Sequence, residues 1–251
     1  MYRGTIALLA GLVLPRLASA QVADSYRKAF ELADSQPRIV IQYLECMVKH
    51  QGFAVQVGTG ADVVCARVGG RMLAAIVERM VTGERFIFNA VDVNSAVRID
   101  RPDTAEVLTM LRAQTLAASR ALIAAGADTS ALLTPVVYRA DSVIHAWVIP
   151  FSMIPMPTGA FTGGVHHFVL DRNARQELSR TPLTPRSPVT GIRNGDWIIE
   201  STDSIPAFSE LLMAHMLRMD GRPASIVMPT RIAKLSGDAR TITWDFLPRK
   251  P

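Results

Sequence analysis

The sequence predicts an α+β fold, in which N-terminal helices and one long helix pack on a mainly antiparallel, meander-like β-sheet. Two observations carry this prediction. Helical spacing of apolar residues is concentrated before residue 126, and after it short β-prone runs follow one another with turn residues between them. Helices and strands are therefore segregated along the chain and do not alternate as in βαβ proteins. We expect a single domain over 21–251, with a soft boundary near 127–135.

The first elements are predicted to be two helices. Asp24 is a suitable N-cap for a short helix over 24–34, and Pro37 opens a second helix over 38–50 that Gly52 closes. Apolar residues recur at helical spacing through the second segment, at Ile39, Tyr43 and Met47.

Short β-prone runs follow these helices. Residues 53–57 and 63–68 flank Gly58-Thr59-Gly60, which predicts a hairpin. The stretch 71–81 suits either a helix or a strand, and 84–93 is a clearer strand because aromatic residues alternate along it.

The strongest local prediction is a helix over 104–125. Asp103 supplies an N-cap, Glu106 stands three residues further on as in a capping box, and Gly126 supplies the stop. We expect one continuous stripe of small and apolar residues to face a sheet or another helix at close approach, formed by Leu108, Leu111, Thr115, Ala118, Leu122 and Ala125.

The second half of the chain is predicted to be a series of strands. Residues 136–139 and 143–149 form a hairpin around Ala140-Asp141-Ser142, and 164–171 gives a further strand. Prolines mark the segments 150–159 and 182–195 as loops, because proline cannot donate to a sheet.

A last hairpin is predicted near the C-terminus. Asp220-Gly221 is a strong hairpin turn, so we favour strands over 211–219 and 223–228, with a helix over 211–219 as the alternative. Residues 240–246 predict a final strand.

The N-terminus predicts export. A short basic stretch precedes ten uncharged residues, 5–14, and Ala18-Ser19-Ala20 has the small-x-small pattern that signal peptidase recognises. We therefore expect residues 1–20 to be a bacterial signal peptide, cleaved after Ala20, and the remainder to be periplasmic or secreted. Arg16 leaves an uncleaved anchor as the alternative, and no later stretch is long enough to span a membrane.

Charge and motifs exclude several partners and cofactors. Cleavage would remove Arg3 and Arg16 and no acid, which lowers the formal net charge from +5 to +3, too little for a nucleic-acid footprint. Gly58-x-Gly60 lacks the third glycine of a dinucleotide fingerprint, so we expect no bound cofactor.

The two cysteines of the chain, Cys46 and Cys65, are 19 residues apart. In an oxidising compartment they are most simply one disulfide, with two buried free thiols as the alternative.

Three histidines form the candidate site for chemistry. His166 and His167 are adjacent on a predicted strand, so their rings point to opposite faces and cannot both bind one metal. His167 with His145 on a neighbouring strand, and with Asp171 or His215 as a third group, would make the kind of ligand set that zinc accepts. This set is the candidate metal site.

The loop that leads into these histidines is the candidate binding segment. It places apolar side chains in a proline- and glycine-rich stretch, which is typical either of a loop folded onto the core or of a rim that contacts a partner protein or small apolar ligand. The candidate binding residues are Phe151, Met153, Met156, Phe161, His166 and His167. The sequence thus favours a non-catalytic binding or interaction protein, with a hydrolytic or metal-dependent enzyme centred on His145 and His166 or His167 as the alternative.

Overall fold

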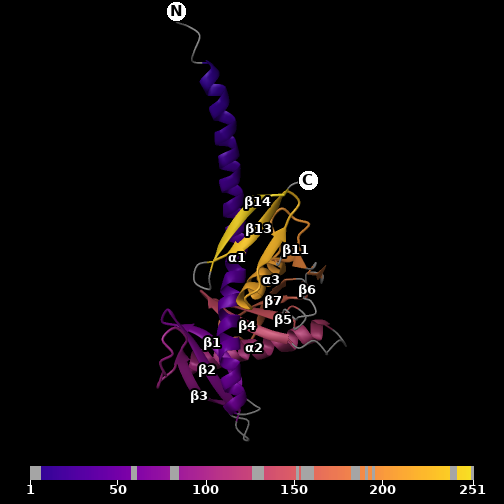
Figure 1. Ribbon diagram of the computed structural model, residues 1–251. Coiled ribbons are helices and arrows are strands. Elements are labelled where there is room, and N and C mark those ends of the chain that lie inside the picture. Colours follow the sequence, from indigo (N-terminus) through magenta and orange to yellow (C-terminus); the bar gives the residue numbers. More distant parts are fainter. Residues whose placement is uncertain are drawn as a thin grey trace, which may run out of the picture.

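A computed structural model of the chain describes residues 7–57, 61–79, 85–125, 133–150, 153, 161–181, 187–189, 192–193, 196–237 and 242–249. Within these residues the predicted α+β class is confirmed (Figure 1). The helices are α1 (Ala7–Val57), α2 (Thr104–Ala125) and α3 (Phe208–Met219).

The described strands form three sheets and one two-stranded ribbon. The first sheet has the order β1-β2-β3 and contains β1 (Asp62–Val68), β2 (Arg71–Arg79) and β3 (Arg85–Asp92). The second has the order β4-β5-β7-β8 and contains β4 (Leu133–Ala140), β5 (Val143–Pro150), β7 (His166–Leu170) and β8 (Glu177–Thr181). The ribbon pairs β6 (Phe161–Thr162) with β9 (Ser187–Pro188).

The third sheet has the order β10-β11-β12-β13-β14. Its strands are β10 (Ile192–Arg193), β11 (Asp196–Glu200), β12 (Ala224–Val227), β13 (Arg231–Ser236) and β14 (Thr243–Pro248). Among the described strands, β11 and β12 alone are paired in parallel, and α3 connects them. The remaining pairs are antiparallel, as the meander-like pattern predicts.

Helix α1 is one continuous element where the sequence predicts two helices and a strand. It runs through Pro37 and includes residues 53–57, which were expected to be extended. Pro37 lacks the N–H that an internal helical residue donates, but it is buried, and packing of the helix on either side offsets that loss. Figure 1 shows the N-terminal part of α1 projecting beyond the rest of the molecule, and residues 7–20 of the expected signal peptide belong to this part.

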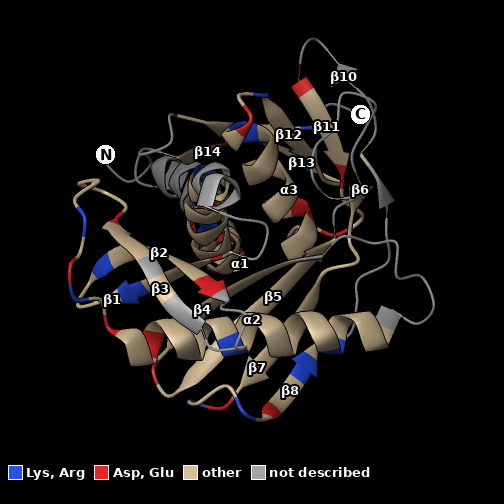
Figure 2. Cartoon of the chain, turned by 90° about the horizontal axis from the view of Figure 1, so that it is seen from below, with Lys and Arg blue, Asp and Glu red and all other residues tan. Residues whose placement is uncertain are grey.

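Helix α2 has the predicted bounds but a different buried face. Asp103 caps it by accepting a hydrogen bond from the backbone N–H of Glu106. The predicted stripe is offset from the true contact face, since Thr115 and Leu122 are exposed. The face buried against the sheets consists of Val107, Met110, Leu111, Ala113, Gln114, Ala117 and Ala121. Figure 2 shows α2 lying alongside β4, β5 and β7. The three alanines belong to the apolar core beneath this helix and allow the close approach that the sequence predicts.

Residues 208–219 form helix α3, so the prediction of a strand over 211–219 is wrong. All residues from Leu211 to Leu217 are buried, and a helix covered on every side shows no amphipathic period. Gly221, at φ +73°, ends this helix where a hairpin was expected, and Arg222 N–H donates to Leu217 O. The ambiguous stretch 71–81 is a strand over Arg71–Arg79.

Two apolar cores lie on opposite sides of the sheets. One lies beneath α1 and α3 and includes Phe30, Leu44 and Trp147. The other lies beneath α2 and includes Val64 and Phe168. Among the residues that the structure describes, no helix is both long enough and apolar enough to cross a membrane.

Candidate functional site

The first two sheets meet at a seam that stays open. β1 is an edge strand of one sheet and β4 an edge strand of the other, and they approach each other without forming a ladder. Pro135 on β4 helps to explain the gap. A proline is tolerated in an edge strand where its missing N–H faces away from the paired strand, so at Pro135 the side facing β1 has no donor. At this position β1 and β4 therefore cannot pair to join the two sheets into one.

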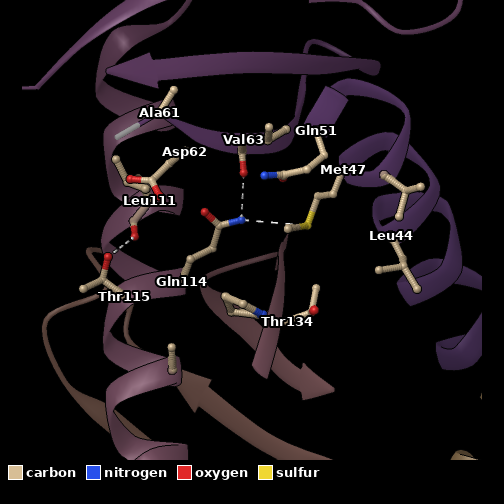
Figure 3. Close-up of a pocket in the computed structure, with 13 residues that line it drawn as sticks. Leu44, Met47, Gln51, Ala61, Asp62, Val63, Leu111, Gln114, Thr115 and Thr134 are labelled. Atoms are coloured by element: carbon tan, nitrogen blue, oxygen red, sulfur yellow. Dashed lines mark hydrogen bonds between the residues drawn. The ribbon is translucent and has the colours of Figure 1, made fainter. Parts of the chain in front are cut away.

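A cavity of about 510 Å³ occupies this seam (Figure 3). Small-molecule pockets in proteins span roughly 300–1,000 Å³. Its lining comes from α1, β1, α2 and β4. The buried floor is formed by Leu44, Val63, Leu111 and Gln114, and the exposed rim by Val48, Gln51, Asp62 and Thr115. Met47, Ala61, Ala118 and Pro135 complete the apolar walls, and Thr134 adds a hydroxyl to them.

Gln114 is the buried polar group of the floor, with 6% of its surface exposed. Its Nε2 lies 3.4 Å from the carbonyl oxygen of Val63 and 4.0 Å from the Sδ of Met47. Val63 belongs to the open edge of β1, so the glutamine amide donates to a carbonyl that a neighbouring strand would otherwise satisfy. Gln114 therefore blocks the edge of β1 just as Pro135 blocks that of β4.

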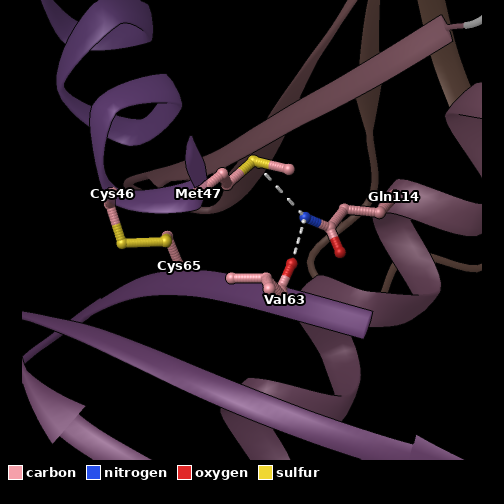
Figure 4. Close-up of a disulfide and its surroundings, with 5 residues drawn as sticks. All are labelled: Cys46, Met47, Val63, Cys65 and Gln114. Carbon is pink, nitrogen blue, oxygen red and sulfur yellow. Dashed lines mark hydrogen bonds between the residues drawn. A yellow bond between two sulfur atoms is a disulfide. The ribbon is translucent and has the colours of Figure 1, made fainter. Parts of the chain in front are cut away.

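A disulfide between Cys46 and Cys65 lies beside the cavity (Figure 4). It joins α1 to β1 with a Cα–Cα distance of 6.3 Å, and both residues are at most 2% exposed. The predicted pairing is confirmed. The bond fixes α1, which carries Leu44 and Met47, against β1, which carries Val63, and so fixes two walls of the cavity.

The polar groups of the cavity suit binding. Among the described lining residues, Asp62 at the rim is the sole ionisable one. The other polar groups are the amides of Gln51 and Gln114 and the hydroxyls of Thr115 and Thr134. Such a lining presents apolar contacts with a few hydrogen-bonding groups that can orient a ligand.

His145 and His167 come together, as the sequence predicts, on the face of the second sheet that is turned away from α2. The Nδ1 of His145 lies 3.0 Å from the Nε2 of His167, with the two ring planes within 8° of each other. Trp147 stacks on His167 at a centroid distance of 3.8 Å, and Thr181 Oγ1 lies 3.3 Å from the Nδ1 of His167. One nitrogen of the facing pair must donate and the other accept.

Burial keeps these rings neutral at neutral pH. It lowers the pKa of His167 to about 4, with a smaller contribution from the neighbouring His145, and it also lowers the pKa of His145. A neutral imidazole is the form that binds a metal or accepts a proton.

The other members of the candidate metal set lie elsewhere. Asp171 accepts hydrogen bonds from the backbone N–H groups of Asn173, Arg175 and Gln176, within its own turn. In the described part of the chain, no three metal-binding side chains gather. His166 points to the opposite face of β7 from His167 and is 4% exposed, and burial together with Arg180 lowers its pKa.

The candidate binding loop is only partly described. Met153 is fully buried and belongs to the core, and His166 is buried as well, so neither forms a rim. Phe151 and Met156 lie outside the described residues, as does the side chain of Phe161. The hairpin expected at 58–60 and the boundary segment 127–132 also lie outside them.

His215 does not approach the histidine pair. Its Nε2 lies 2.7 Å from Asp34 Oδ1, whose second oxygen accepts hydrogen bonds from Trp244 Nε1 at 2.7 Å and Arg38 Nε at 2.5 Å. Sequence reasoning missed this buried network, because 181 residues separate Asp34 from His215 and no local pattern links them.

Comparison with family models, curated proteins and solved structures found no match for the chain.

Proposed function

We propose that this chain is an exported protein, periplasmic or secreted, that binds a small apolar ligand in the seam cavity and does not transform it. The observation that carries the proposal is the cavity itself, about 510 Å³ between two sheet edges that Pro135 and Gln114 keep apart. Apolar groups removed from water by binding there contribute about 25 cal/mol per Å².

Two features support the exported location. The pattern over 1–20 is that of a signal peptide. The disulfide between Cys46 and Cys65 suits an oxidising compartment, where such bonds persist.

The test is a binding titration with the environment-sensitive probe N-phenyl-1-naphthylamine on the full protein. We expect saturable binding with one site and a rise in probe fluorescence. Ala118→Phe places a ring in the cavity and should weaken probe binding at least tenfold, whereas Ala124→Phe, at an exposed position of α2 outside the cavity, should leave it unchanged. Equal urea midpoints for the two variants would show that both remain folded. Binding that Ala118→Phe leaves intact would refute the cavity as the site.

The second candidate is hydrolytic or metal-dependent chemistry at His145 and His167, which their 3.0 Å contact favours. Metal analysis after incubation with Zn²⁺ would test it. Stoichiometric zinc that is lost in His167→Ala and kept in His166→Ala would support a site at the pair. Substoichiometric zinc that is the same in all three proteins would reject it.

A further inference from the structure

Helix α2 carries apolar side chains on a side that does not face the sheets. Three of its 22 residues are charged, Glu106, Arg112 and Arg120, so the helix is tan along most of its length in Figure 2. Its main packing partners are β1, β4, β5 and β7, yet Leu122 is 39% exposed and Ile123 is 70% exposed. A surface helix ordinarily presents charged and polar residues on its outer side. The apolar outer side of α2 therefore indicates a surface that another molecule covers.

Part of this surface has a heptad repeat. Its residues alternate at steps of three and four, the spacing of the a and d positions of a coiled coil, and are Leu108, Leu111, Thr115, Ala118 and Leu122, here called the α2 stripe. Leu111 is buried, whereas Thr115 and Leu122 are exposed and the other two are half-buried. The hydroxyl of Thr115 donates to the carbonyl oxygen of Leu111 at 3.0 Å, so covering the stripe would not leave this polar group unpaired.

The surface beside the α2 stripe is hollow. A cavity of about 350 Å³ is lined by Leu108, Leu111, Arg112 and Thr115. The seam cavity continues from it, because Leu111 and Thr115 line both, and it extends the hollow to Ala118. An apolar groove along residues at helical spacing is the kind of surface that receives a second helix.

We propose that the α2 stripe binds the α2 stripe of a second copy of this chain, with the two helices antiparallel. A two-fold axis beside Leu116 and Ala117 places Leu111 opposite the partner's Leu122 and Thr115 opposite the partner's Ala118. Large side chains then meet on both sides of the axis and small ones meet next to it, where the two backbones can approach closely. The opposed helix dipoles favour this orientation, and the contact closes at two chains because it is isologous.

The symmetry of the repeat is the reason to choose a second copy as the occupant. A stripe that recognised a different helix would not need to match itself about its own centre. Helix α2 is about 33 Å long, so a contact between two such helices lies at the low end of the size range of specific interfaces, and we expect a Kd of about 10 µM. This inference goes beyond the proposed function and does not depend on it.

The experiment is sedimentation velocity of the full protein at about 1, 10 and 100 µM, a range that brackets the expected Kd. We expect mainly a monomer of 27.4 kDa at the lowest concentration and mainly a dimer of twice that mass at the highest. Leu122→Glu should raise the Kd at least about tenfold, because the symmetric dimer would bury an unpaired carboxylate twice. Ile123→Glu makes the same change at the next residue, off the stripe, and should leave the Kd unchanged. Equal urea midpoints for the two variants would show that both remain folded.

Introduced cysteines test the orientation. The two native cysteines form a disulfide, so Thr115→Cys and Ala118→Cys each add one free thiol. When the two variants are mixed and oxidised, antiparallel helices should give mainly the mixed dimer that joins one variant to the other. Intact mass distinguishes this product from the two homodimers.

The outcomes decide the proposal. A wild-type protein that stays monomeric at the highest concentration would overturn it and leave the α2 stripe to a partner of different sequence. A dimer that Leu122→Glu leaves intact, or that Ile123→Glu weakens equally, would overturn it as well. Homodimers in excess of the mixed product would show parallel helices and overturn the proposed register. Leu122 does not line the seam cavity, so these outcomes leave the proposed function to its own test.

Discussion

Asp34→Ala removes an acceptor that joins three distant parts of the chain. The carboxylate of Asp34 on α1 accepts hydrogen bonds from His215 on α3, from Trp244 on β14 and from Arg38 one turn further along α1. Asp34 is fully buried, His215 is 2% exposed and Trp244 is 7% exposed. The network therefore fastens α1 to the C-terminal half of the molecule from inside the core.

The expected loss of stability follows from the donors left behind. His215 and Trp244 would each retain a buried N–H without an acceptor, at about 1–3 kcal/mol apiece. The Arg38 side chain is 38% exposed and can turn to water once Asp34 is removed, so the guanidinium adds little to the loss. We expect Asp34→Ala to lower the free energy of unfolding by about 4 kcal/mol, within the roughly 3–5 kcal/mol typical of a broken buried pair.

The pH dependence has a definite sign. Burial by itself raises the pKa of Asp34, but hydrogen bonding and charge from His215, with hydrogen bonds from Arg38 and Trp244, outweigh it and lower the pKa below its ordinary value. The contribution of Asp34 is therefore present above about pH 4, the pKa in the unfolded chain, and is lost as the pH falls through the lower folded value. In Asp34→Ala the free energy of unfolding should therefore fall less steeply below about pH 4 than it does in the wild type.

Urea unfolding monitored by far-UV circular dichroism, with the disulfide intact, measures the effect. Glu31→Ala, an exposed acid one turn earlier on α1, is the control and should change stability by no more than about 0.5 kcal/mol. The free energy of unfolding of Asp34→Asn, which keeps one carbonyl acceptor, should lie between those of Asp34→Ala and Glu31→Ala. An Asp34→Ala protein within about 1 kcal/mol of Glu31→Ala would refute this account of the network.

Four further predictions concern the disulfide, the histidine pair, α2 and the N-terminus. Replacing Cys46 and Cys65 by serine together should cost about 3 kcal/mol in urea unfolding, as expected for a loop of 19 residues; alkylation of both thiols in unreduced wild-type protein would contradict the bridge. An unfolded histidine takes up its proton near pH 6.5, whereas the folded pKa of His167 is about 4, so stability should fall as the pH is lowered between these values. A urea midpoint that does not change over this interval would contradict this prediction, and so would a midpoint that changes as much in His167→Phe as in the wild type. Ala117→Leu overfills the tight contact beneath α2 and should cost about 1–3 kcal/mol, whereas Ala124→Leu on the exposed side should be nearly neutral in thermal unfolding. Mass spectrometry of exported material should give a chain that begins at Gln21, and a full-length mass would show that residues 1–20 are retained.

Elements with local end signals were predictable from the sequence. The bounds of α2 follow from Asp103 and the glycine after it, and the β4–β5 hairpin from its turn residues. The buried face of α2 was not predictable to the residue, because the helix lies across two sheets and buries a polar residue, Gln114, among alanines.

Segments whose surroundings decide their structure were mispredicted or missed. Residues 211–217 are buried on all sides in a helix that connects parallel strands, and a glycine after them ends a helix as readily as it forms a hairpin. Strands β8, β11 and β13 were not predicted. The facing of His145 and His167 was predicted, since it needs only two neighbouring antiparallel strands and the two-residue alternation of side chains.

The position of the disulfide gives the open seam a physical rationale. An apolar cavity between two unpaired strand edges costs stability, because the lining atoms lose packing contacts and the edge groups lose ladder partners. Gln114 already donates to the carbonyl of Val63 on β1, and Pro135 on β4 has no N–H, so closing the gap would gain few hydrogen bonds between the two strands. The Cys46–Cys65 bond holds α1 and β1 in place whether or not the gap is filled. In the doubly serine-substituted protein the walls are free to move together. Loss of probe binding there, under conditions where the protein remains folded, would show that the bond preserves the cavity as well as the fold.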